Sequence, residues 1–160
     1  MQDEVLIFEC AGARFGLPAS GVSEVVRAVE VTQVPQAPDS LLGMINLRGE
    51  LVAVVSTRVR LGLDVVPLNP SHQFIIMRTT DGLFALHVDR AIDMISADQG
   101  SQAGDSDEGV PIGVNEGMVQ YVAKTEQGIL PVLEPQTILT DDLAQAIRRV
   151  TSTTATETDR

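Results

Sequence analysis

The sequence contains a single cysteine, Cys10, so no disulfide can form within the chain. One cysteine is consistent with a reducing, cytoplasmic setting. The N-terminus, Met1 to Glu4, lacks the basic segment that opens a signal peptide. No apolar run approaches the roughly 20 residues of a membrane-spanning helix. We therefore expect a cytoplasmic protein that does not insert directly into a membrane.

Aromatic residues are also scarce, at 3% of the chain, and tryptophan is absent. The core must then be built from Val, Ile, Leu and Ala, a composition that favours strands. The formal net charge is −11, and Lys124 is the only lysine. This charge argues against nucleic acid and anionic membrane surfaces, because both bind through clustered basic residues. The remaining cations are arginines, which are typical of protein–protein interfaces.

The centre of the sequence predicts a β-hairpin. Met44 to Leu47 is a short apolar run that contains one Asn, and Leu51 to Val55 is apolar at every position. A strand of the second kind is buried on both faces. Arg48-Gly49-Glu50 forms the predicted turn, where glycine permits a positive φ. The hairpin therefore presents one cation, Arg48, on a rigid support.

Other short strands follow at regular spacing, which predicts a β-barrel or a sandwich. We expect them at residues 5–10, 14–17, 28–34, 73–79, 83–88, 91–95, 118–124 and 129–133. Residues 19–26 are predicted to form one or two helical turns, because Val22, Val25 and Val26 would share a face.

Residues 57–61 are predicted to be a short helical or looped piece, and residues 98–109 an acidic loop. A helix is predicted from 141, with Leu143 and Ile147 on its apolar face. The length predicts one domain over residues 1–150, or two small intertwined halves that share a core. Residues 151–160 read as a disordered tail.

No catalytic or metal-binding motif is present, so we expect no enzyme activity, no metal and no cofactor. His72 and His87 have no further ligands at metal-binding spacing and are interpreted as structural. Cys10 ends an apolar strand and is expected to be buried and unreactive. An alternative is a small-ligand site in a groove lined by Val22, Ile45, Phe74 and Met77, although no polar set converges there.

Five segments together resemble the CheW-like domain family, over about residues 4–140. They are Phe15-Gly16-Leu17, Val22-Ser23-Glu24-Val25-Val26, Val34-Pro35-Gln36-Ala37-Pro38, Leu42-Gly43-Met44-Ile45-Asn46-Leu47-Arg48-Gly49 and His87-Val88-Asp89. The resemblance implies an all-β fold of two intertwined five-stranded SH3-like barrels sharing a core, with a short C-terminal helix. It also implies a non-catalytic adaptor that couples the cytoplasmic tips of methyl-accepting chemoreceptors to the regulatory domain of a CheA-like histidine kinase.

By the same resemblance, Val22, Glu24, Gly43 and Arg48 match positions tied to partner binding. Each has a plainer interpretation. Val22 packs in the core, Gly43 lets the backbone turn, and Glu24 and Arg48 are solvated surface charges. An adaptor of another two-component pathway, such as pilus motility or development, fits the sequence as well.

The sequence departs from the family at one point. The family commonly has Asp-Leu-Arg after the second strand of the hairpin, where this chain reads Ser56-Thr57-Arg58. The acid that would pair with Arg58 is thus missing from its expected place, which bears on the choice of partner.

Overall fold

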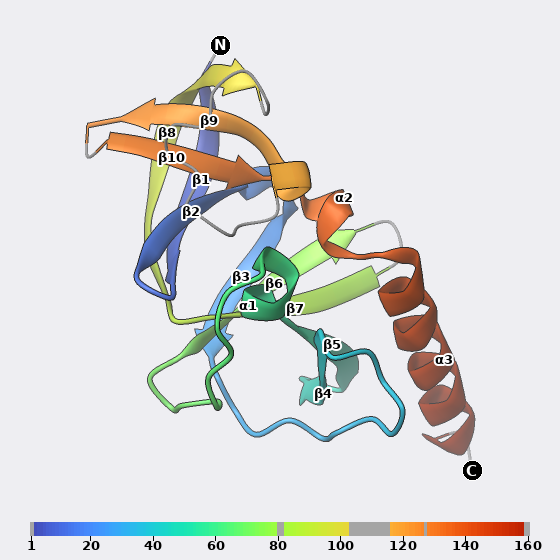
Figure 1. The fold of residues 1–160 in the computed structure, drawn as a ribbon. Helices are drawn as coiled ribbons and strands as arrows, with labels where there is room; N and C mark the ends of the chain where they lie inside the picture. The colour runs from blue at the N-terminus through green and yellow to red at the C-terminus, as the bar shows by residue number, and fades with distance from the viewer. Residues whose placement is uncertain (1, 80–81, 103–115, 127, 159–160) are drawn as a thin grey trace.

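The computed structural model describes residues 2–79, 82–102, 116–126 and 128–158. Their strands form two five-stranded units, which lie one above the other in Figure 1. The strands of the first unit come from both ends of the chain. They are β1 (Gln2–Cys10), β2 (Ala13–Pro18), β8 (Arg90–Gln102), β9 (Val119–Thr125) and β10 (Gly128–Leu133).

This first barrel is closed in the order β1-β2-β10-β9-β8. Closure depends on a parallel pairing between Gly16 of β2 and Val132 of β10. A Cβ at position 16 would lie 2.6 Å from Val5 Cγ1 and 3.1 Å from Leu130 Cδ2. Gly16 is therefore needed because the interior of the barrel fills the space beside it.

The second unit is built from the middle of the chain, and we call it the second sheet. Its strands are β3 (Val22–Arg27), β4 (Leu41–Leu47), β5 (Glu50–Ser56), β6 (Gln73–Thr79) and β7 (Gly82–Val88). They are hydrogen-bonded in the order β3-β6-β7-β5-β4, so β3 and β4 are the edge strands. All pairings are antiparallel except the one between β5 and β7.

The buried apolar residues fall into three clusters. One fills the first barrel and includes Val5, Tyr121 and Val132. Another fills the second unit and includes Val52 and Phe74. The third and largest lies between the units and draws on both of them: Phe8, Cys10, Phe15 and Leu17 from the first, and Val55, Ile75, Met77 and Leu86 from the second. A strand that is buried on both faces thus packs one face into the interior of its own unit and the other face into the shared core.

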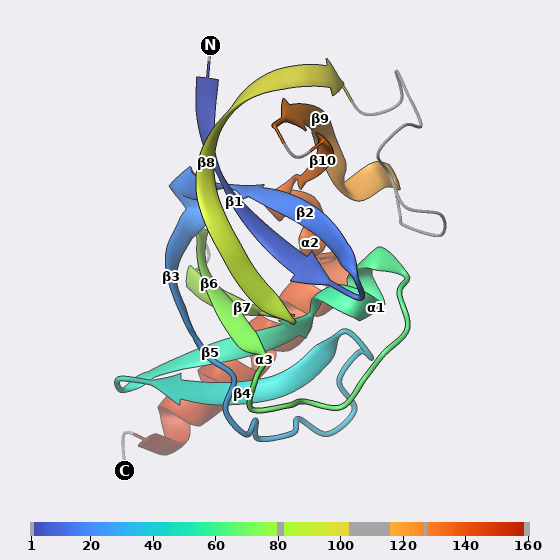
Figure 2. The ribbon, with the colours of Figure 1, turned by 90° about the vertical axis from the view of Figure 1, so that its left-hand side faces the viewer.

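The helices lie at the edges of these units. Helix α1 (Thr57–Leu61) is capped by Ser56, whose hydroxyl accepts a hydrogen bond from the Val59 N–H at 3.2 Å. Helix α2 (Pro135–Ile138) leads into α3 (Asp141–Thr158), which lies beside the second sheet (Figures 1 and 2). Short 3-10 turns occupy Ala19–Gly21 (η1) and Glu116–Met118 (η2).

The C-terminal segment is anchored by Arg60 of α1. Its Nε and Nη2 donate to the carbonyls of Ile138 and Thr137, at 2.6 and 2.9 Å. The buried side chains of Leu143 and Ala146 join the shared core. No helix within the described ranges is both long and apolar enough to cross a membrane.

The predicted all-β fold of two intertwined five-stranded SH3-like units with a shared core is confirmed. Several local predictions are wrong. Of residues 19–26, only 19–21 are helical, as the 3-10 turn η1, and the rest belong to strand β3. Residues 28–34 form no strand, and only Thr32 makes an isolated bridge, to Met44.

Two boundaries also differ. Strand β8 continues to Gln102, into the predicted acidic loop, and residues 103–109 lie outside the described residues. Helix α3 runs to Thr158, so it is longer than predicted and occupies most of the expected tail.

Candidate functional site

The structure brings together two of the four residues predicted to bind partners. Arg48 donates a hydrogen bond from Nη2 to Glu24 Oε2, and the two form an ion pair. The Arg48 side chain is 68% exposed and that of Glu24 32%. The hydrogen bond and charge of Glu24 raise the pKa of Arg48, so the guanidinium is a permanent cation. Both side chains are accessible from solvent while they contact each other.

A rigid turn presents Arg48. The two-residue connection between β4 and β5 has positive φ at both Arg48 (52°) and Gly49 (89°), as a type I′ turn requires. Asn46 Oδ1 accepts a hydrogen bond from the Gly49 N–H at 2.7 Å, which braces the turn. Asn46 therefore has a local structural role in the sequence Asn-Leu-Arg-Gly.

Gly43 has a backbone role in the structure. Its φ is +154°, and a Cβ there would lie 2.4 Å from the carbonyl oxygen of Thr32. That carbonyl accepts from the Met44 N–H at 2.8 Å, and the Thr32 N–H donates back to the Met44 carbonyl at 2.9 Å. The close approach of the 28–40 segment to β4 thus needs glycine at position 43.

Val22 lies at the start of β3, opposite Met77 of β6. Its side chain is half-buried and packs against the shared core. The alternative ligand groove is not formed, because Ile45 and Phe74 fill the second unit whereas Met77 belongs to the shared core. All three of these side chains are buried.

A second ion pair, which the sequence did not reveal, joins the two units. Arg58 Nη2 contacts both oxygens of Asp89, at 3.0 and 2.8 Å, and Arg58 Nη1 donates to the Asp64 carbonyl at 2.9 Å. The expectation that Arg58 lacks an acid is therefore wrong, since Asp89 supplies it from a distant part of the chain. Ser56, at the position of the family's Asp, caps α1 instead.

The two histidines, His72 just before β6 and His87 in β7, contact each other. His87 Nε2 lies 2.8 Å from His72 Nδ1, which also accepts from the Asn69 N–H at 3.3 Å. Burial and the neighbouring His72 lower the pKa of His87 to about 4, so its ring is neutral at pH 7. Among the described residues, no group of three or more His, Cys, Asp or Glu side chains is arranged to hold a metal ion.

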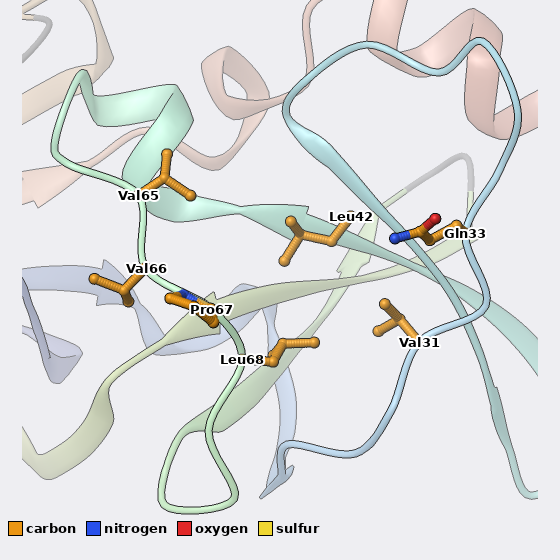
Figure 3. Close-up of a pocket in the computed structure, with 7 residues that line it drawn as sticks. All are labelled: Val31, Gln33, Leu42, Val65, Val66, Pro67 and Leu68. Atoms are coloured by element: carbon orange, nitrogen blue, oxygen red, sulfur yellow. The ribbon is translucent and has the colours of Figure 1, made fainter.

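The structure also contains two surface clefts. The first, of about 440 Å³, lies between the 28–40 and 62–72 segments beside β4. Its lining is apolar except for Gln33: Val31, Leu42, Val65, Val66, Pro67 and Leu68. Figure 3 shows Val31, Leu42 and Leu68 pointing into the space between the two segments. We call it the apolar cleft.

The second cleft, of about 970 Å³, lies where the first barrel, the second sheet and α3 meet. Its lining is mixed and includes Pro18, Arg78, Gln120, Glu134 and Ala144. We call it the junction cleft. Unlike the apolar cleft, it draws side chains from both units and carries charges of both signs.

The sequence matches the CheW-like domain over residues 4–143. The chain belongs to this family. It is 25% identical to the chemotaxis protein CheW of Bacillus subtilis over 144 residues, which cover 90% of this chain and 91% of that relative. It is 28% identical to CheW of Helicobacter pylori over 85 residues, which cover 53% of this chain and about half, 52%, of that relative.

The CheW-like fold is also found in a solved structure. The scaffolding protein TtCheW from Thermoanaerobacter tengcongensis superposes with a TM-score of 0.78 at 23% identity, over 89% of this chain and 96% of that one. The fold of two five-stranded units around a shared core is thus common to both proteins. In this CheW-like chain, Arg48 and Glu24 form a solvent-accessible ion pair on the second sheet.

Proposed function

We propose that this CheW-like protein is a non-catalytic, cytoplasmic adaptor that couples chemoreceptor tips to the regulatory domain of a CheA-like histidine kinase. Its family and its likeness to a protein described as a scaffold support this function. The observation that carries the proposal is the exposed pair of Arg48 and Glu24 on the braced β4–β5 turn. We propose Val22, Glu24, Gly43 and Arg48 as the partner-binding region, Gly43 acting through the backbone.

The chemistry of this region suits a protein partner. Arg48 presents a planar guanidinium that can form two parallel hydrogen bonds with a carboxylate or with backbone carbonyls. A helical receptor tip offers both kinds of acceptor. Separately from this pair, the apolar cleft offers a surface for aliphatic side chains, and the segments that flank it carry Glu30, Asp39 and Asp64 but no Lys or Arg.

The proposal is tested by titrating the purified protein with the cytoplasmic tip of a chemoreceptor and, separately, with the regulatory domain of a CheA-like kinase. Arg48→Ala should weaken binding to at least one of them by about ten- to a hundredfold, because charge-assisted bonds are lost. Arg48→Lys should restore part of the loss, since an ammonium cannot reproduce the planar fork. Arg90→Ala removes another exposed arginine, 59% accessible and paired with Glu9, and serves as the control.

Native affinity of the Arg48→Ala protein for both partners would place the interface elsewhere. Failure of the unaltered protein to bind either partner would contradict the adaptor function itself. An adaptor of another two-component pathway, in pilus motility or development, is the alternative. Capture of partners from the source cell, followed by their identification, distinguishes these pathways because each has its own receptor and kinase.

A further inference from the structure

The ion pair of Arg58 and Asp89, in which Arg58 Nη2 contacts both carboxylate oxygens, is largely buried. The side chains are 10% and 22% exposed, whereas Arg48 and Arg90 are more than half exposed in their pairs. Arg58 Nε is buried without a hydrogen-bond partner in this part of the structure. The charge of the Arg58 guanidinium is therefore balanced through the two terminal nitrogens, chiefly by the Asp89 carboxylate.

Asp89 lies where the chain passes from the second sheet back to the first barrel, between β7 and β8. Its Oδ2 accepts a hydrogen bond from the Ala11 N–H in the β1–β2 turn at 3.1 Å. Its own N–H donates to the Glu9 carbonyl of β1 at 3.0 Å. One carboxylate thus joins the first barrel directly to Arg58, which α1 holds at the end of β5.

Further contacts between the units include a hydrogen bond from the Ala91 N–H of β8 to Gln73 Oε1 of β6, at 2.6 Å, and the shared apolar core. Apolar contact is non-directional and roughly proportional to buried area, so it resists separation of the units more than it resists sliding. A largely buried ion pair has the opposite properties. It adds little net stability after desolvation, but its charge-assisted hydrogen bonds depend on the relative position of the two groups.

We propose that the Arg58–Asp89 pair is a lock that holds the two five-stranded units in one relative orientation. Asp89 and Arg58 are then positioning residues, which touch no partner themselves. The effect on signalling rests on the proposed function, since an adaptor in which the units can shift would bind its partners but transmit less between them.

The protein contains its own reporter for this lock. Cys10 is the only cysteine, is fully buried in the shared core and precedes Ala11, which contacts Asp89. Burial, with the nearby Asp89 carboxylate, raises the pKa of the Cys10 thiol to about 12, so it does not react in the closed molecule at pH 8. The rate at which Cys10 reacts with dithionitrobenzoate then measures how often the two units separate enough to expose it.

In the full chain at pH 8, Asp89→Asn should raise the Cys10 labelling rate by about tenfold or more, because Arg58 loses its counter-ion in the closed state. Arg58→Met should also raise it, although this change removes a cation that lowers the pKa of Cys10, so faster labelling in both variants reports opening and not the loss of the Asp89 charge. The labelling rate should not depend on low concentrations of urea, since a shift of one unit against the other exposes little surface. Arg90→Ala, in the adjacent residue, is the matched control and should label like the unaltered protein. If Asp89→Asn does not fold, Arg58→Met combined with Asp89→Asn removes the buried charge and keeps an acceptor for Ala11.

Unchanged labelling in a folded Asp89 variant would overturn the lock. So would a rate that rises steeply with urea and tracks the loss of global stability, because the pair would then support folding without fixing orientation. With receptor tip and kinase present, Asp89→Asn should bind each partner within about threefold of normal but activate the kinase less. Full activation of the kinase would refute the link between the lock and signalling. Loss of binding by the unaltered protein would refute the adaptor function and leave the labelling result to judge the lock.

Discussion

Arg48 and Glu24 form an ion pair across the open side of the second sheet. Glu24 belongs to the edge strand β3, and Arg48 follows the opposite edge strand β4. The sheet must curl to bring them together, and the Thr32–Met44 bridge spans the same gap in the backbone. Two of the four residues proposed for partner binding thus already contact each other, so a partner at this point must compete with that contact or add to it.

Exchanging the two charges separates these possibilities. Arg48→Glu alone should weaken partner binding by about ten- to a hundredfold, because it also places two carboxylates together. The double variant Glu24→Arg with Arg48→Glu restores an internal ion pair, and we expect it to remain at least about tenfold weaker in binding. Titration and urea unfolding of the same samples provide the measurements. Full recovery of binding in the double variant would mean that both residues act only through each other.

Gly43→Ala should destabilise the fold. The new Cβ would meet the Thr32 carbonyl, a backbone atom that cannot move aside without breaking the bridge to Met44. We expect a loss of about 2–3 kcal/mol in the free energy of unfolding. Gly21→Ala is the control, because a Cβ there meets only the flexible end of Met77, at 3.2 Å. Equal stability of the two variants would contradict the backbone role of Gly43.

The sequence predicted the hairpins and the buried strands because their apolar runs are continuous. It failed for residues 22–26 for a physical reason. A register shift between Val22 and Glu24 in β3 breaks the two-residue alternation, and the resulting spacing of valines imitates a helical face. Residues 28–34 do alternate, but only Thr32 finds a backbone partner, so alternation there produced no strand.

The ion pairs could not be predicted from spacing. Glu24 lies 24 residues from Arg48, and Arg58 lies 31 residues from Asp89. Neither separation corresponds to neighbours on one helix or in one hairpin, so only the tertiary structure brings these charges together. The resemblance to a family identified Glu24 and Arg48 individually, without indicating that they touch. Asp89 lies in His87-Val88-Asp89, one of the segments that carry the resemblance, but the resemblance does not indicate that it pairs with Arg58.

Stability should fall as the solution is acidified. The pKa of His87 is lowered to about 4 in the folded state, against about 6.5 when unfolded. The unfolded chain therefore binds more protons between these values, and the free energy of unfolding decreases as pH falls from about 6.5 to about 4. We expect this histidine to contribute about 2 kcal/mol to that decrease. Urea unfolding from pH 7.5 to 4.5 should show a shallower dependence for His87→Gln, and an identical one would refute the assignment.

The first turns of α3 should matter far more than its end. Leu143 is fully buried in the shared core, so Leu143→Ala should cost about 2–4 kcal/mol in the free energy of unfolding. Deletion of residues 151–160 should leave the melting temperature nearly unchanged, because Leu143 and Ala146 remain in place. Thermal unfolding of both proteins tests this, and a large fall in the truncated chain would show that the deleted segment packs.

The composition of the first barrel has a consequence for biosynthesis. Strands β1 and β2 are made first, yet they pair with β8 and β10, which leave the ribosome only after the whole second sheet has been translated. The second sheet is continuous from Val22 to Val88 and can assemble while the rest is still being made. The N-terminal hairpin must wait meanwhile, with Phe8, Phe15 and Leu17 still without the later strands that help bury them. Nascent chains stalled before β10 should therefore expose these side chains to chaperones.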